Sequence, residues 1–442
     1  MNVIWFVIDT LRSDHLGCYG YFRDTSPNID RIAAEGLLYK DSYASAIATG
    51  PGFTSLFTGL SAINHGFYLT PWNVPNKPLL DDTIPTLPEI IQTRGAYTTA
   101  AFDNLINFRS HMKQFVRGFE FYTNITRSPG WLHHHILADE VNYRLLPWLD
   151  HHHDEQFFAF VHYWDPHTPY NMPGNFRGRH NGGIDSLEVR RAADGYEYVP
   201  GWGLPEKIAV DGELNIHLYD DEVYYVDHCI GDVCRKLEEL EVFDETVIVI
   251  TGDHGEDLDV HGLWGHGTVH ETTIRVPFII RDPAIKRPET IGGFVQHADN
   301  LPTILRYFPE TEKANPRLFD PRSLPEIGSD FDGSDVVSDT WVPREEIVVE
   351  SGAHRAVLAP PWKLIWYADG SRAELFNTEN DPLELNDRAE EQVEISSRLQ
   401  RKLDAWVVSQ LKQQRSDPIH SVDGAWTCYI GNSTGKSTEE AG

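Results

Sequence analysis

Short apolar runs recur along the chain, each bounded by Gly, Asp or Pro. They cover residues 2–9, 97–103, 157–163, 246–253 and 276–282. Runs of this length that lack a polar alternation predict strands buried on both faces of a mainly parallel sheet. The pattern therefore favours an α/β fold.

Stretches with helical spacing lie between these runs. Ser26 and Pro27 precede "NIDRIAAEG", which combines a capping residue, a proline in the first turn and a closing glycine. Residues 222–243 carry apolar side chains at helical spacing and lead directly into the 246–253 run. Alternating strands and helices predict a large sheet flanked by helices.

The pattern changes near residue 345. From there the sequence predicts short antiparallel strands joined by turns, followed by a helix that starts at "VEISSRLQRKL". The last residues show little periodicity. We therefore predict a catalytic α/β domain at 1–344, a small α+β subdomain at 345–415 and a tail at 416–442.

Charge limits the partners that this protein can attract. The chain has 442 residues, 40% of them hydrophobic, and 67 acidic against 37 basic residues give a net charge of −30. Such a surface argues against nucleic acid or an anionic membrane as a partner. An anionic substrate therefore needs a locally positive site.

Cysteine usage and the first residues indicate a compartment. Four cysteines (Cys18, Cys229, Cys234 and Cys428) are scattered without a disulfide framework, which favours free thiols. The opening "MNVIWFVIDT" enters a strand without a basic leader, and its apolar run is too short to span a bilayer. We expect a cytoplasmic protein.

Acidic and imidazole side chains follow two of the predicted strands. Asp9 ends the first run, and Asp253 with His254 ends the run at 246–253. Ligands bind beyond the carboxyl ends of parallel strands, so these side chains can meet in one crevice and hold a divalent metal. The alternative for a single Asp after a strand is a cap or turn residue.

A hydroxyl residue precedes a predicted helix in "SYASAIATGPGFTSLFTGL". Thr49 stands just before a helix expected to start near Pro51, where the helix dipole and free backbone N–H groups stabilise an alkoxide or an oxyanion. The alternative is that Thr49 only caps the helix.

Two loops are rich in histidine, the side chain best able to donate a proton near neutral pH. His167 lies in "VHYWDPHTPY" and His266 lies in "HGLWGHGTVHETTIRVPFII". Both follow or flank predicted strands in loops punctuated by Gly and Pro, which favours a functional role over a plain surface position.

Together these segments resemble the sulfatases of the alkaline phosphatase superfamily. The resemblance runs from residue 2 to about 407, through "NVIWFVIDTLRSDHLGCYGYFRDTSPNIDRIAAEG", "HYWDPHTPY", "VITGDHGEDLDVHGLWGHG" and "KLIWYADGSRAELFNTENDPLELND". It implies an alkaline-phosphatase-like sandwich with a large, mostly parallel sheet and a small C-terminal α+β subdomain.

The resemblance also implies roles for single residues. Asp9, Asp253 and His254 fall on metal-ligand positions, and Thr49 falls on the position of the nucleophile, whose oxygen also faces the metal. His167 and His266 fall where the family contacts the transferred anion or the leaving oxygen.

Three positions depart from the family pattern. A second acidic ligand is common after the first, but this chain has Thr10. Family sulfatases carry Cys or Ser, oxidised to formylglycine, in a C-x-P-S-R-type motif, whereas this chain reads from Thr49 to Phe53 as Thr-Gly-Pro-Gly-Phe. Many members have Lys where His266 stands.

These departures favour phosphorus over sulfur chemistry. A formylglycine hydrate attacks with one hydroxyl and expels sulfate with the other, whereas Thr49 has a single hydroxyl, as in the superfamily's threonine-dependent diesterases and phosphoethanolamine transferases. We expect a phosphodiester or phosphonate monoester hydrolase. A sulfate-ester hydrolase that works without formylglycine and a metal-binding pseudoenzyme stay open as alternatives.

The expected ligand set has two carboxylates, one imidazole and the Thr49 oxygen. This mixed set suits one Mn²⁺ or Zn²⁺ ion better than Ca²⁺, which prefers oxygen ligands throughout. A small anionic ester is the expected partner, with Asn104 and Lys113 as candidate substrate contacts in loops that carry no recognisable motif. A homo-oligomer stays open.

Overall fold

The protein is described here by a computed structural model. It describes residues 1–68, 80–104, 112–124, 137–168, 170–180, 212–262, 265–311, 331–370, 372–411 and 419, without the side chains of 113 and 212–215. Cys428, nearly all of the predicted tail and much of the loops expected to hold the organic part of the substrate lie outside these residues.

The centre of the fold is an eight-stranded sheet with the order β4-β3-β5-β1-β6-β7-β2-β8. The strands are β1 (Asn2–Ile8), β2 (Leu37–Tyr43), β3 (Thr98–Asp103), β4 (Phe121–Asn124), β5 (Phe157–Tyr163), β6 (Thr246–Gly252), β7 (Phe278–Arg281) and β8 (Glu289–Gln296). All five predicted strands are present. Neighbours pair in parallel, except that β7 is antiparallel to both β6 and β2.

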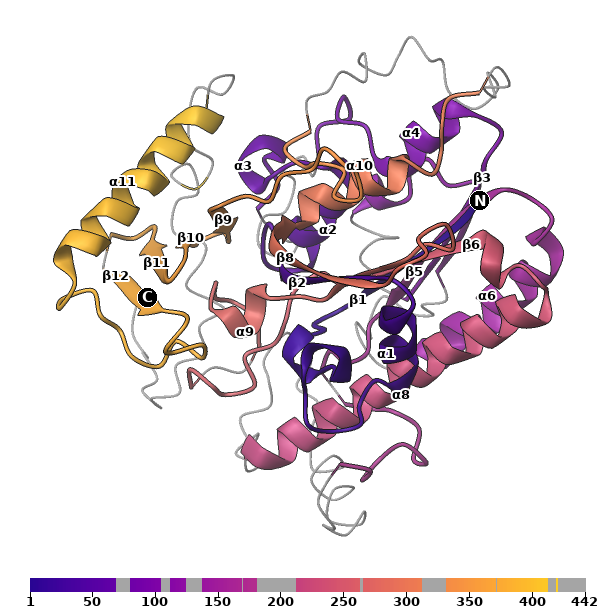
Figure 1. Ribbon diagram of the computed structural model, residues 1–442, viewed down its shortest axis with the longest axis horizontal. Helices are drawn as coiled ribbons and strands as arrows, with labels where there is room; N and C mark the ends of the chain where they lie inside the picture. Colours follow the sequence, from indigo (N-terminus) through magenta and orange to yellow (C-terminus); the bar gives the residue numbers. More distant parts are fainter. Residues whose placement is uncertain are drawn as a thin grey trace, which may run out of the picture.

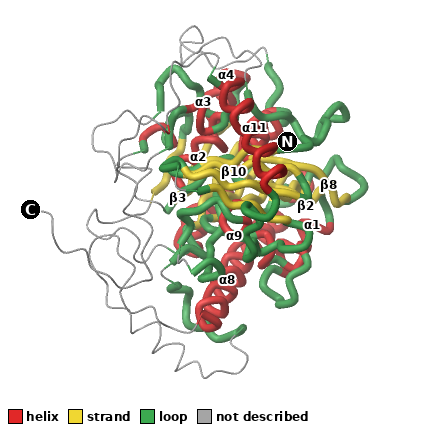
Figure 2. The backbone as a smooth tube through the Cα atoms, turned by 90° about the vertical axis from the view of Figure 1, so that its left-hand side faces the viewer, coloured by secondary structure: helices red, strands yellow, loops and turns green. Residues whose placement is uncertain are grey.

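Helices cover both faces of this sheet (Figures 1 and 2). One face packs against α1 (Pro27–Ala34), α6 (Ala138–His152) and α8 (Gly212–Glu239). The other packs against α2 (Thr49–Thr58), α4 (Leu87–Arg94) and α10 (Asn300–Leu305). The predicted sandwich of a mostly parallel sheet between helices is confirmed.

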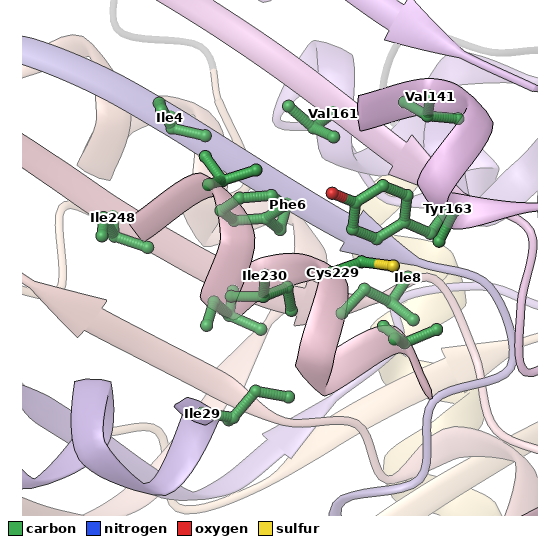
Figure 3. Packing of buried hydrophobic residues seen from close by; sticks show 14 of the residues in the cluster. Ile4, Phe6, Ile8, Ile29, Val141, Val161, Tyr163, Cys229, Ile230 and Ile248 are labelled. Atoms are coloured by element: carbon green, nitrogen blue, oxygen red, sulfur yellow. The ribbon is translucent and has the colours of Figure 1, made fainter. Parts of the chain in front are cut away.

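Strand β1 shows why an uninterrupted apolar run forms a central strand. Alternate side chains of a strand point to opposite faces, so Ile4, Phe6 and Ile8 join the core beneath α1, α6 and α8 (Figure 3). Val3, Trp5 and Val7 join the core beneath α2, α4 and α10. Because helices cover both faces of the sheet, every side chain of β1 is buried and apolar residues occupy the strand from Val3 to Ile8. The first charged side chain is Asp9, directly after the strand.

A second, smaller sheet follows in the C-terminal part of the chain. Its antiparallel order is β12-β11-β10-β9, formed by β9 (Ile347–Glu350), β10 (His354–Ala359), β11 (Trp362–Tyr367) and β12 (Ala373–Asn377). Helix α11 (Val393–Gln410) covers one face, while the other packs against apolar residues near the end of β2. The strands and helix match the expected subdomain, and its boundaries at 345 and 415 stay predictions.

A buried ion pair sits at the junction of the two sheets. Arg355 Nε donates to Glu350 Oε1 at 3.1 Å, and the same carboxylate accepts from the hydroxyl of Tyr68 at 2.6 Å and from the backbone N–H of Ile63 at 3.0 Å. Glu350 is 0% exposed. Its charge therefore depends on these donors, and they tie β9 to the segment after α2.

Two smaller observations bear on the sequence predictions. Cys18, Cys229 and Cys234 are free thiols, as expected. Among the described residues, no helix combines the length and apolar character that a membrane crossing requires.

Candidate active site

Asp9, Asp253 and His254 meet at the carboxyl ends of two neighbouring strands. Strands β1 and β6 pair in parallel with Ile8 opposite Gly252, so the residues that follow emerge side by side. His254 Nε2 lies 3.8 Å from Asp9 Oδ1 and 3.3 Å from Asp253 Oδ2. All three side chains are 0% exposed. The predicted convergence is confirmed.

The polar atoms of this group fit a bound cation. Both carboxylate oxygens of Asp9, and Oδ2 of Asp253, are buried and accept no hydrogen bond from the described residues. Buried oxygens without donors are costly, and a divalent ion would satisfy them. One carboxylate oxygen of Asp9, one of Asp253 and one ring nitrogen of His254 lie within 4.8 Å of one another.

The surroundings of His254 favour the neutral imidazole that a metal ligand requires. Its Nδ1 lies 2.9 Å from the carbonyl oxygen of Gly255, to which it donates, so Nε2 presents its lone pair to the carboxylates. Burial, together with the nearby His266, holds the pKa of His254 well below its usual value. A neutral imidazole and two carboxylates form a mixed N/O set of the kind that Mn²⁺ or Zn²⁺ accepts.

The two carboxylates differ in their protonation behaviour. Burial and the neighbouring Asp9 raise the pKa of Asp253 well above its usual value. Burial also opposes ionisation of Asp9, but His162 and the other imidazoles outweigh it and lower the pKa of Asp9 to about 2. Two such acids side by side favour a site that a cation completes.

Thr10 contacts the candidate ligand Asp253 through its backbone. Its φ of 55° lies in the left-handed region, which costs a threonine about 1–2 kcal/mol. This conformation aims its N–H at Asp253 Oδ1, at 3.1 Å, and the N–H of His254 reaches the same oxygen at 2.8 Å. Thr10 therefore orients Asp253, where the family pattern has an acid.

Thr49 faces the same centre. It is the first residue of α2, with Ala48 in the cap position, so the helix begins two residues before the predicted Pro51. Its Oγ1 lies 3.3 Å from His254 Nε2, and the residue is 9% exposed. The alternative of a capping threonine is wrong, because Ala48 occupies the cap and the hydroxyl points to the ligand group.

His266 and His167 line the outer side of the group. The His266 ring stacks on His254 with centroids 4.1 Å apart, and the His167 ring lies 5.1 Å from His266. Burial lowers the pKa of His266, but Glu256, whose Oε2 is 3.4 Å from Nδ1, more than offsets this and raises it. Burial lowers the pKa of His167.

The sequence predictions missed a pair beside Asp9. His162 of β5 has Nδ1 2.9 Å from Asp103 Oδ1 and Nε2 3.9 Å from Asp9 Oδ2. Burial opposes protonation of His162, yet both carboxylates together raise its pKa to about 9. Its position within the apolar run "FFAFVHY" was the available signal, since a histidine between buried neighbours needs polar partners.

Phe53 replaces the arginine of the family motif and fills its place with an aromatic ring. It is 0% exposed and packs against Phe57, Phe115 and Phe160. Its ring also meets the His162 ring in an edge-on arrangement with centroids 4.8 Å apart. Phe53 thus packs between the aromatic core and His162 and brings no charge to the site.

The two remaining candidate residues are placed less fully. Asn104 directly follows Asp103 at the end of β3 and is 5% exposed. Lys113 begins a short 3-10 helix, Lys113–Phe115, and its side chain lies outside the described residues. Their roles as substrate contacts stay predictions.

A second group with metal-ligand side chains, His261, His270 and Glu384, lies near the small sheet. His261 uses both ring nitrogens, on Asp257 at 2.5 Å and on the carbonyl of Leu383 at 2.8 Å. Glu384 pairs with Lys363 at 2.8 Å. These partners account for the group as a structural junction.

Comparison with known proteins identifies relatives of this chain. The multifunctional alkaline phosphatase superfamily protein PehA of Trinickia caryophylli is 25% identical, over 73% of this chain and 76% of its own length. Iduronate 2-sulfatase of Mus musculus is 24% identical, over 66% of this chain and 61% of its own.

Among solved structures, the phosphonate monoester hydrolase of Silicibacter pomeroyi superimposes with a TM-score of 0.73 at 19% identity, covering 93% of this chain and 96% of its own. That likeness concerns the fold. The model of the Sulfatase family matches residues 1–310, well over half of the 442 residues. The chain belongs to the sulfatase family and is a hydrolase of ester bonds.

Proposed function

We propose that this protein is a metal-dependent phosphoester hydrolase that cleaves phosphodiesters or phosphonate monoesters with Thr49 as its nucleophile. The observation that carries the proposal is the Thr49 hydroxyl, 3.3 Å from Nε2 of His254 within the group of candidate metal ligands. Among the residues that the structure describes, no other hydroxyl is recorded within hydrogen-bonding distance of that imidazole nitrogen.

A threonine nucleophile suits phosphorus better than sulfur. Attack by a formylglycine hydrate leaves a second hydroxyl, which can expel the bound sulfate as the aldehyde re-forms. A sulfated Thr49 lacks that route and would need water to attack sulfur. A phosphorylated Thr49 can be opened by water through in-line attack at phosphorus, so turnover remains open.

Each residue of the site has a task in this scheme. Asp9, Asp253 and His254 would hold the ion, which when bound supplies the Lewis acidity that favours the Thr49 alkoxide. The start of α2 adds the positive end of a helix dipole next to the same oxygen. His266, which has a raised pKa and stacks on His254, would donate a proton to the leaving oxygen.

The charge of the site favours a singly charged group. Phe53 brings no cation, and His162, which is 0% exposed, faces two carboxylates. A phosphodiester or phosphonate monoester carries one negative charge, so it needs less compensation than a phosphate monoester dianion. The phosphonate monoester hydrolase among the structural neighbours has the same fold, which agrees with this choice.

The second candidate is a sulfate-ester hydrolase that works without formylglycine. It is favoured by the relatives, because iduronate 2-sulfatase matches two thirds of this chain. A pseudoenzyme that only binds a metal is disfavoured, because Asp9, Asp253, His254 and a hydroxyl are all retained in one buried group.

A substrate panel tests the proposal. Protein freed of metal with a chelator is assayed on an aryl sulfate, a phosphate monoester, a phosphodiester and a phosphonate monoester, with Mn²⁺, Zn²⁺ or Ca²⁺ added back. We expect the diester and phosphonate to turn over fastest, with Mn²⁺ or Zn²⁺. Faster turnover of the aryl sulfate would favour the sulfatase alternative, and no turnover of any ester would favour the pseudoenzyme.

A further inference from the structure

A chain of polar contacts runs from β4 through β3 and β5 to Asp9, which follows β1. Asp103 ends β3, His162 lies in β5 and Asp9 follows β1, and these strands are consecutive in the sheet. The pairing of β1 with β5 places Val7 opposite His162, two residues before Asp9. The His162 ring therefore lies between two buried carboxylates.

Asp103 is fixed from its far side. Its Oδ2 accepts hydrogen bonds from the Tyr122 hydroxyl and from Asn124 Nδ2, each at 2.6 Å and both from β4. Oδ1 is thereby left to the His162 ring, whose Nδ1 lies at 2.9 Å. These two donors hold Asp103 in place, and Asp103 in turn fixes the orientation of the His162 ring.

The aromatic surroundings fix the ring as well. Phe53 meets His162 edge-on with centroids 4.8 Å apart, and Phe160 lies nearly parallel to it at 6.4 Å. His162 and Asp103 are 0% and 1% exposed, so water does not compete for their polar atoms. With Nδ1 on Asp103, the other ring nitrogen, Nε2, lies 3.9 Å from Asp9 Oδ2.

We propose that His162 and Asp103 form a positioning pair that orients Asp9 for metal binding. His162 Nε2–H donates to Asp9 Oδ2, which leaves Oδ1, the oxygen 3.8 Å from His254 Nε2, for the ion. The present 3.9 Å separation exceeds a hydrogen bond, and a carboxylate shift of about 1 Å closes it. The metal part of this inference rests on the proposed function.

This pair compensates for two departures of the chain. Thr10 provides no second carboxylate and Phe53 provides no guanidinium, so Asp9 carries more of the metal binding and lacks the neighbouring cation of the family motif. A buried ligating carboxylate with a free second oxygen needs a donor there. In this fold the donor comes from β5.

Metal affinity, measured without substrate, tests the inference. The dissociation constant for Mn²⁺ is obtained from the electron paramagnetic resonance signal of the free ion, in the whole protein and in variants. His162→Phe removes both donors, and we expect the dissociation constant to rise about 10- to 100-fold. His162→Gln keeps one amide donor, so a smaller rise is expected.

His15→Phe is the matched control. His15 is also buried, at 6% exposure, and its Nδ1 lies 2.7 Å from Asp220, but it has no described contact with Asp9 or Asp253. Its removal should leave the Mn²⁺ dissociation constant unchanged. An equal loss of affinity in the His15 and His162 variants would mean that general destabilisation is responsible, and would overturn the proposal.

Wild-type affinity in His162→Phe would also overturn it. If that variant does not fold, His162→Gln decides, since wild-type affinity there has the same meaning. The affinity measurement does not depend on the reaction. A wild-type protein that binds Mn²⁺ but cleaves no phosphoester would refute the proposed function, and the role of His162 would still be decided by the Mn²⁺ dissociation constants of the variants.

Discussion

Replacing Thr49 separates a nucleophile from a structural threonine. Thr49→Ala deletes the hydroxyl that lies 3.3 Å from His254 Nε2, and Thr49→Ser keeps that hydroxyl while removing the methyl group. Since Ala48 occupies the cap position of α2, neither change removes a helix cap. The two variants therefore differ mainly in whether an attacking oxygen is present.

The expected magnitudes for the two roles differ widely. Thr49 is 9% exposed, so Thr49→Ala loses about 0.8 kcal/mol of methyl burial and about 1 kcal/mol of hydrogen bonding, which lowers the unfolding free energy by at most ~2 kcal/mol. Removing the nucleophile of a covalent hydrolase costs about 10⁴- to 10⁶-fold in kcat. That corresponds to roughly 5–8 kcal/mol of activation free energy.

Both quantities can be measured on the same samples. Turnover of a chromogenic phosphodiester in the presence of Mn²⁺ gives kcat, and urea unfolding gives the stability. We expect Thr49→Ala to be folded and inactive, and Thr49→Ser to retain part of the activity. Near wild-type turnover by Thr49→Ala would refute the covalent mechanism and indicate direct attack by water.

Four further changes test other parts of the structure. His266→Ala should slow esters with poor leaving groups far more than nitrophenyl esters, and equal losses would indicate substrate binding instead. Burial lowers the pKa of His266, but Glu256 more than offsets this and raises it above its usual value. The protonated donor is therefore present below this raised pKa and is lost as the pH rises through it, and Glu256→Gln should move the fall in kcat to lower pH. Asp253→Asn should raise the melting temperature of chelator-treated protein, because burial and Asp9 disfavour the charged form of Asp253. At saturating Mn²⁺ the same change should lower the melting temperature, because an ion at 100 times its Kd contributes about 2.7 kcal/mol of stability to the protein that binds it. A lower melting temperature in both conditions would contradict that reasoning. Arg355→Met leaves Glu350 charged without its partner and should cost about 3–5 kcal/mol in urea unfolding, whereas a loss below 1 kcal/mol would show that Tyr68 and the backbone suffice.

The sequence was sufficient for the parts of the fold that repeat a simple pattern. Uninterrupted apolar runs identified the strands at the centre of the sheet, because both faces of these strands are covered. Strands β2, β4 and β8 were missed because "LLYKDSY", "FYTN" and "ETIGGFVQ" carry polar or glycine positions at the sheet edges and beside β7. The antiparallel direction of β7 depends on its connection, which periodicity does not report.

The candidate site likewise contains residues that the sequence predicted and residues that it did not. Asp9 and Asp253 were predictable because each ends an apolar run, and parallel strands bring such ends together. His162 and Asp103 were not, since their meeting depends on β3 and β5 being neighbours and on which face each side chain takes. The cap position of Ala48 likewise required the backbone, since Ala is a poor capping residue by composition.

The presence of Thr49 at the start of α2 affects how the active protein can be made. A threonine side chain carries a methyl group on the carbon that bears oxygen, so oxidation of that carbon would give a ketone and not the aldehyde of formylglycine. Under the proposed function, the nucleophile is therefore complete once Thr49 has been incorporated, without oxidation to formylglycine. If Thr49 is the nucleophile, the fraction of active molecules in any expression host should equal the fraction that has folded and taken up its ion.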